Sequence, residues 1–288
     1  FAGSITAILI NTPGTSAAAA TTFDGYPLAQ KGEAGRALGI AVISSTVGGI
    51  FSVLILCFAA PLLARVAYEF RSPEYFALTV FGLSMLASIS AGGAVKNLIG
   101  GIFGVWLSTI GAERVTGIER FMFGNYELYE GLHFVPIFIG LFAISELLVQ
   151  SKTVDKIIKT VSMKAVKLPT LEDYKKIWKT ILRSCGIGTF IGVLPAEGAT
   201  VASMIGYSEA RRWSKNKKEF GKGSIEGIAG AEAANNSATG GAMVPTMVLG
   251  IPGSGTTAII LVGLMVHGLR PGVYPVSYTH LRAHETVL

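Results

Sequence analysis

The feature that most constrains this chain is a series of long stretches without Asp, Glu, Lys or Arg. They cover residues 37–64, 75–95, 97–112 and 233–269. A helix needs about 20 mostly apolar residues to cross roughly 30 Å of hydrocarbon. Charged residues make up only 15% of the chain, whereas about 25% is usual in soluble domains. We therefore expect an all-α integral membrane protein, a multi-span helical bundle rather than a soluble protein with buried helices.

The predicted spans lie at about 37–63, 74–91, 94–111 and 131–149. The net charge of +6 collects between apolar segments, where it indicates membrane orientation rather than nucleic-acid binding. Residues 150–183 hold nine Lys or Arg residues against three acids, and a second basic segment follows residue 207. Basic loops stay in the cytoplasm, and the helical spacing of apolar residues in the first of them predicts an amphipathic surface helix.

The apolar segment 184–207 lies between these two basic segments. If it crossed the membrane, one basic segment would lie outside, against the charge rule. Its centre, Pro195-Ala196-Glu197-Gly198, favours a turn over a continuous helix. We therefore prefer a re-entrant hairpin to a span.

Two Pro-Gly pairs interrupt apolar runs in matching contexts. Pro13-Gly14 stands in "ILINTPGTSAAAATTFDG" and Pro252-Gly253 in "MVLGIPGSGTTAIILVG". The run 233–269 would extend roughly 55 Å as one helix, so we expect breaks at Pro245 and at 250–255. Broken helices in an internal repeat are the best sequence pointer to a transporter's binding site.

Such breaks have a chemical use, because the first N–H groups of a helix lack partners and bind anions. Proline ends the incoming helix, glycine admits a ligand to the backbone, and Ser or Thr caps the outgoing helix. The alternative is that Pro-Gly only kinks a packed helix. The candidate substrate-binding residues are Asn11, Thr12, Pro13, Gly14, Thr15, Ser16, Pro252, Gly253, Ser254, Gly255 and Thr256.

Three further candidates, Asn235, Asn236 and Ser237, could bind substrate or Na⁺ through amide and hydroxyl groups, or could simply pack between helices. Glu197, at the predicted hairpin tip, is the candidate for ion coupling. Glu197 can have that role only if the tip lies deeper in the membrane than the hydrated interface. A charged residue deep in a membrane is costly and is usually functional.

Two long stretches resemble the signature of the large membrane subunit of the tripartite tricarboxylate transporters. They are "GSITAILINTPGTSAAAATTFDGYPLAQKGEAGRALGIA" and residues 192–272, beginning "GVLPAEGATVASMIGYSEARRW". The resemblance implies a multi-pass permease of the bacterial inner membrane that imports tricarboxylates or dicarboxylates on a Na⁺ or H⁺ gradient. The partners that it implies are a small membrane subunit, a periplasmic solute-binding protein and the lipid bilayer.

The organisation that we expect has four parts. Residues 1–150 form the first part of the permease domain, 151–183 a basic cytoplasmic loop, and 184–274 the second broken-helix region. Residues 275–288 abandon the small-residue pattern, and we expect them to be non-native. We also expect the chain to be a fragment of a longer permease.

Other functions find less support in the sequence. No motif for a nucleophile or a metal-dependent hydrolase is present, so we expect neither an enzyme nor a cofactor. The two cysteines, Cys57 and Cys185, lack metal-ligand spacing, and no metal site is predicted. An anion channel, which shares broken helices, and a non-transporting membrane scaffold remain as alternatives.

Overall fold

The computed structural model describes residues 2–71, 94–113, 116–133, 167–194, 198–269 and 271–272, with short pieces between 73 and 84 and between 136 and 151. The chain divides into two compact units. Unit 1 comprises 1–68, 156–257 and 271–288, and unit 2 comprises 69–155 and 258–270. The described residues are overwhelmingly helical, as the sequence predicts.

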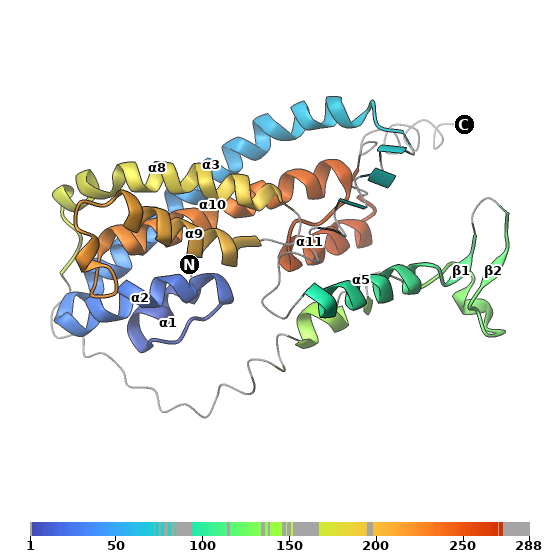
Figure 1. Ribbon diagram of the computed structural model, residues 1–288, viewed down its shortest axis with the longest axis horizontal. Helices are drawn as coiled ribbons and strands as arrows, with labels where there is room; N and C mark the ends of the chain where they lie inside the picture. Colours follow the sequence, from blue (N-terminus) through green and yellow to red (C-terminus); the bar gives the residue numbers. More distant parts are fainter. Residues whose placement is uncertain are drawn as a thin grey trace. The chain divides into compact units, whose positions relative to one another are not determined.

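Unit 1 is built around α10, against which α3, α8 and α9 pack along its length (Figure 1). Its elements are α1 (Ala2–Ile10), η1 (Ser16–Ala18), α2 (Ala19–Leu28), η2 (Ala29–Glu33), α3 (Ala34–Ala67), α8 (Leu171–Val193), α9 (Gly198–Trp213), η5 (Lys217–Glu219), α10 (Ile225–Leu249) and the first turn of α11 (Gly255–Val266).

Small residues let these helices approach closely. A Cβ built on Gly188 of α8 would lie 2.2 Å from the carbonyl oxygen of Ala234 in α10. On the side facing α3, a Cβ on Gly240 would lie 2.3 Å from the carbonyl oxygen of Ser52. Backbone-to-backbone packing of this kind is typical of helices in membranes, where lipid is as apolar as leucine and close contact must hold the bundle together.

The variant Gly188→Ala is expected to destabilise unit 1 by about 1–3 kcal/mol through overpacking. Gly186, two residues earlier on α8, is exposed and would meet nothing within 4 Å. Gly186→Ala is therefore the matched control, and it should be neutral or stabilise the helix by roughly 0.5–1 kcal/mol. Unfolding of both variants in the same detergent measures the difference, and equal stabilities would contradict this packing.

The run 233–269 is broken once. Helix α10 ends at Leu249, where Gly250 adopts the left-handed conformation (φ 70°) and its N–H donates to the Thr246 carbonyl. Glycine is favoured there because it carries no Cβ. The second predicted break, at Pro245, is wrong: this residue lies inside α10. It is buried among the surrounding helices, and their packing outweighs the hydrogen bond that proline cannot donate.

The first Pro-Gly pair lies at the tip of a hairpin, as predicted, with α1 packed against α2. The segment 24–36 is largely helical and joins α2 to α3 through a single break at Gly32 (φ 81°). Within it Asp24 is fully buried.

Helices α8 and α9 also pack together as a hairpin, with α8 ending at Val193 and α9 beginning at Gly198. The guanidinium of Arg183 in α8 lies 5.0 Å from the ring centroid of Trp213 at the end of α9. The end of α9 therefore lies beside Arg183, where the segment 184–207 begins, as a re-entrant segment requires. Whether the hairpin enters a membrane stays a prediction.

A bidentate ion pair joins the start of α3 to the start of α8, which lies in the first basic segment. Arg36 of α3 donates to both carboxylate oxygens of Asp173, at 2.9 and 2.5 Å, and Asp173 also closes the capping box with Thr170 that starts α8. The hydrogen bonds from the Arg36 guanidinium lower the pKa of Asp173. The stability that this carboxylate contributes is present above its unfolded-state pKa and is lost as the pH falls through its lowered value.

Unit 2 contains α5 (Ala94–Ser108), a short hairpin of β1 (Gly111–Ala112) and β2 (Glu119–Arg120), η3 (Tyr126–Leu128), η4 (Ile139–Ile144) and the rest of α11. In the antiparallel hairpin Gly111 pairs with Arg120. The predicted spans 74–91 and 131–149 fall in good part on residues outside those that the structure describes.

Among the described residues, one continuous helical stretch, Ser16–Ala67, is long and apolar enough to cross a membrane. Leu98–Ser108 and Gly255–Val266 are shorter apolar helices. The second half of α3 leaves large apolar side chains exposed, including Phe58 at 77% and Leu62 at 65%. Large exposed apolar patches often mark interaction sites.

Candidate functional site

The first Pro-Gly motif folds back onto α1. Asn11 takes a left-handed conformation (φ 54°), and the N–H groups of Thr12 and Gly14 donate to the carbonyls of Thr6 and Gly3. One 3-10 turn beginning at Ser16 then leads into α2. Most side chains of the motif stay accessible, namely those of Asn11, Pro13, Thr15 and Ser16.

The second motif also ends one helix and caps the next. Ser254 and Thr257 cap each other across the first turn of α11, with the Ser254 N–H 2.9 Å from Thr257 Oγ1 and the Thr257 N–H 3.2 Å from Ser254 Oγ. Gly253 is buried, whereas Thr256 is exposed and Ser254 and Gly255 are half-buried. The predicted helix break and hydroxyl cap are therefore present at this motif, whereas the access of a ligand to the Gly253 backbone stays a prediction.

The two motifs meet the same third element, the start of α9. Ser16 Oγ lies 2.9 Å from Thr200 Oγ1, and a Cβ built on Gly198 would lie 3.5 Å from the Cβ of Ser254. We call this group of four residues, Ser16, Gly198, Thr200 and Ser254, the tip site. It joins three helix starts from distant parts of the sequence, and the first N–H groups of each helix have no partner within their own helix.

The tip site contains no acidic side chain among its four residues, and two of its hydroxyls face each other. Hydroxyls both donate and accept hydrogen bonds. Ser16 and Thr200 can therefore bond to each other when no ligand is present and turn to an anion when one arrives. Helix starts add the positive end of the helix dipole. The arrangement suits an anion whose negative charge is spread over oxygen atoms.

The glycines of the two motifs pack tightly. The Gly14 N–H donates to Gly3, and the Gly253 N–H donates to Thr246 Oγ1 at 3.3 Å. A Cβ on Gly14 would lie 2.8 Å from the Gly3 Cα, and one on Gly253 would lie 2.9 Å from the Ala242 Cα. In this conformation the two glycines bring chain segments together, and the hydroxyls beside them are the groups open to a ligand.

The candidates in the middle of α10 behave as the packing alternative describes. The Asn236 side-chain amide donates to the Glu232 carbonyl at 2.9 Å, and Ser237 Oγ donates to the Ala234 carbonyl at 3.2 Å. Asn235 is half-buried and makes no hydrogen bond to the described part of the chain. Their binding of substrate or Na⁺ stays a prediction. Glu197, the candidate for ion coupling, lies outside the described residues.

Thr200 was not predicted as part of a site. It lies two residues after Gly198, within "GATVASM". A hydroxyl residue near the start of the outgoing helix is a feature that it shares with Ser16 and Ser254 in their own motifs. That shared position is the sequence signal that could have found it.

A second residue missed by the sequence reasoning is Glu232 of α10, which is fully buried. Its two carboxyl oxygens accept hydrogen bonds from Thr21 of α2 at 2.5 Å and from Ser45 of α3 at 2.7 Å. Glu232 immediately precedes the uncharged run 233–269, and the candidates predicted in this part of the sequence all lie inside the run. A carboxyl group within a stretch of small apolar residues was the available signal.

Asp24 of α2 is likewise buried, but its environment is that of a helix cap. Its Oδ1 accepts hydrogen bonds from the N–H groups of Gly223 and Ser224, each at 2.8 Å, at the start of α10. A carboxylate there is stabilised by the unpaired N–H groups and the helix dipole. Asp24 therefore ties the α1–α2 hairpin to α10.

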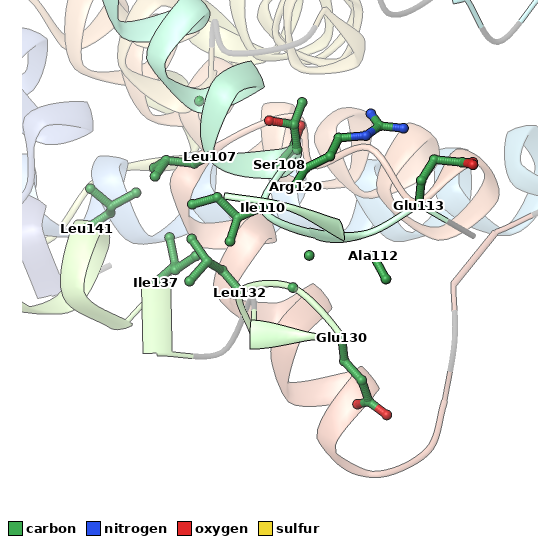
Figure 2. A pocket seen from close by; sticks show the side chains of 14 residues that line it. Leu107, Ser108, Ile110, Ala112, Glu113, Arg120, Glu130, Leu132, Ile137 and Leu141 are labelled. Carbon is green, nitrogen blue, oxygen red and sulfur yellow. The ribbon is translucent and has the colours of Figure 1, made fainter. Parts of the chain in front are cut away.

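Unit 2 contains a cavity of about 480 Å³ between the end of α5, the β hairpin and η4 (Figure 2). Leu107, Ile110, Leu132, Ile137 and Leu141 make much of its lining apolar. Its charged lining residues are Glu113, Arg120 and Glu130, so acidic groups outnumber basic ones. None of the sequence-predicted site residues lines it, and its charges do not favour an anion.

Comparisons with known proteins give a family and two relatives. The model of the "Tripartite tricarboxylate transporter TctA family" matches residues 1–277. An "Uncharacterized 52.8 kDa protein in TAR-I ttuC' 3'region" of Agrobacterium vitis is 42% identical over 274 residues, which are 94% of this chain and 54% of that protein. A second A. vitis protein, "Uncharacterized protein in TAR-II ttuC' 3'region", is 44% identical over 85 residues, covering 30% of this chain and 35% of that protein.

The chain thus spans about half the length of the first curated relative and about a third of the second. No solved structure matches it.

Proposed function

Because the chain belongs to the tripartite tricarboxylate transporter TctA family, we propose that it forms part of a permease for carboxylates. The family is one of transporters rather than enzymes. In this proposal the permease carries tricarboxylates or dicarboxylates across the bacterial inner membrane by secondary active transport, driven by an ion gradient. It is the large membrane subunit, and it works with a small membrane subunit and a periplasmic solute-binding protein.

The observation that carries the proposal is the convergence of both Pro-Gly motifs on the start of α9. A carboxylate must exchange its water for other hydrogen-bond donors as it crosses a membrane. Ser16 contacts Thr200 and Ser254 lies beside Gly198, so three helix starts approach one another, and such starts supply N–H donors and a favourable dipole. In transporters, half-helix starts of this kind point at anionic substrate groups near the bilayer midplane.

The hairpins that carry these starts also suit alternating access. The α1–α2 and α8–α9 hairpins each end at the tip site. Non-helical backbone at membrane depth is tolerated where it is buried in protein or lines a water-filled cavity. Movement of one hairpin away from the other would open the tip site to one side, and in this picture the exposed apolar half of α3 faces lipid or the small membrane subunit.

Counterflow tests the proposal. The full-length permease with its partner subunits is reconstituted into vesicles loaded with unlabelled tricarboxylate, and labelled tricarboxylate is added outside at low concentration. A carrier transiently accumulates label above its external concentration, because the large internal pool drives exchange. We expect this overshoot. A channel would let label equilibrate without an overshoot, and a scaffold would show neither binding nor flux, so either result would contradict the proposal.

A further inference from the structure

The geometry points to a proton-binding site at Glu232, the group that couples a proton to carboxylate transport. This inference rests on the proposed function, since it names the ion that drives it. The side chain is fully buried in the middle of unit 1. Hydroxyls from neighbouring helices converge on both of its oxygens, Thr21 on one and Ser45 on the other, and Ser4 of α1 is hydrogen-bonded to it as well.

No lysine, arginine or histidine of the described residues forms an ion pair with Glu232. An ionised carboxylate buried without a counter-charge is costly, and it avoids that cost by taking up a proton. Burial of this kind is rarely kept in a membrane segment without a functional reason. Asp24 is also buried, but its Oδ1 accepts two backbone N–H groups at the start of α10, whereas Glu232 is met by hydroxyls.

Several titratable groups on the helices packed around Glu232 have other partners. Helix α1 carries none among its described residues. Asp24 of α2 caps α10, Arg36 of α3 pairs with Asp173 of α8, Arg183 of α8 stacks on Trp213 of α9, and Glu226 of α10 accepts a hydrogen bond from Ser214. Cys185 of α8 is buried and Tyr207 of α9 packs against Phe23 and Phe220. Among these groups, Glu232 is the fully buried carboxyl whose described partners are all hydroxyls.

Hydroxyl partners suit a group that must exist with and without a proton. The ionised carboxylate accepts hydrogen bonds from Thr21 and Ser45. When the carboxyl is protonated, its O–H can donate to one of these hydroxyl oxygens, and that hydroxyl can donate in turn to a carbonyl of its own helix. Neither state then leaves a buried polar group without a partner.

The distances favour a proton over a metal ion. Oxygen ligands of Ca²⁺, for example, stand about 2.3–2.6 Å from the ion and are held apart by it. Here each hydroxyl oxygen touches its carboxyl oxygen directly, at 2.5 and 2.7 Å. A hydrogen atom fits between such a pair.

The same hairpin carries part of both sites. Ser4 and Thr21 reach Glu232 from α1 and α2, while Ser16, about 8 Å along the chain from Thr21 at the helical rise, reaches Thr200 in the tip site. If the hairpin moves, Glu232 and the tip site open together. One proton, taken from periplasmic water, is bound at Glu232 while substrate is carried inward, and it is released to cytoplasmic water.

The test uses the full permease with its partner subunits in vesicles free of Na⁺, with the membrane potential clamped at zero. A gradient of two pH units can drive a one-proton symporter to accumulate substrate up to about 100-fold. We expect wild-type protein to accumulate a tricarboxylate, and Glu232→Gln to reach only the external concentration while keeping counterflow. Glu226→Gln, the same change six residues earlier on α10, is the control and should accumulate like wild type.

Ser45→Ala leaves the Glu232 carboxyl in place, and it provides the test if Glu232→Gln does not fold. Losing one hydrogen bond to a charged group costs about 1.5–3 kcal/mol, so half-maximal uptake should move to higher pH by roughly 1–2 units. Accumulation by Glu232→Gln equal to wild type would overturn the inference, as would wild-type uptake that needs Na⁺ and ignores the pH gradient. A wild-type protein without counterflow would instead overturn the proposed function, and the proton site with it.

Discussion

The double variant Ser16→Ala/Thr200→Val is expected to bind tricarboxylates at least 10-fold more weakly than wild type, with its fold intact. The two hydroxyls bond to each other across the tip site at 2.9 Å, so removing both leaves no unpaired buried group behind. Each hydrogen bond to a charged group is worth about 1.5–3 kcal/mol, which corresponds to roughly 10- to 150-fold in affinity. Equilibrium binding to the purified permease complex measures the loss.

Thr46→Val is the control for this variant. Thr46 is exposed on α3, and its hydroxyl donates only to the Val42 carbonyl of its own helix. The change is therefore expected to leave affinity unaltered. If the double variant bound substrate as tightly as Thr46→Val, the hydroxyls of the tip site would not contact the substrate.

Gly14→Val and Gly253→Val are each expected to reduce uptake to background. Their Cβ atoms would lie 2.8 Å from the Gly3 Cα and 2.9 Å from the Ala242 Cα. Real Cβ atoms do not approach backbone so closely, so each tip must shift outward. A shift of the first tip moves Ser16 away from Thr200, and a shift of the second moves Ser254 away from Gly198. Uptake at matched membrane expression measures the result.

Gly49→Val provides the comparison for the two glycine variants. A Cβ on Gly49 of α3 would meet nothing within 4 Å, so this change adds the same bulk without a clash. We expect it to transport. Normal uptake by either tip variant would show that the position of its tip does not matter for transport.

The sequence predicted the features that depend on local chemistry. Proline and glycine at the two motifs, and again at 195–198, predict chain reversals because both residues disfavour a continuing helix. The hairpins at 11–15 and 194–198 and the single break after Leu249 follow from those residues alone. Pro245 is the exception, since the packing around α10 overrides the local signal there.

The contacts between residues far apart along the chain were not predicted. Thr200 belongs to the tip site only because the first hairpin brings Ser16 to it, across 184 residues of sequence. Asp24 looks like a loop residue until α10 places two N–H groups against it. Glu232 becomes a candidate site because hydroxyls on α2 and α3 reach it, and nothing in its neighbouring residues announces them.

The central claim is that both Pro-Gly motifs contact one bound carboxylate at the tip site. The most direct measurement is the rate of thiol alkylation at Ser16→Cys and, separately, at Ser254→Cys, in full-length permease whose Cys57 and Cys185 have been replaced. We predict that a transported tricarboxylate slows alkylation at both positions over the same concentration range. Protection at only one position, or at neither, would contradict it.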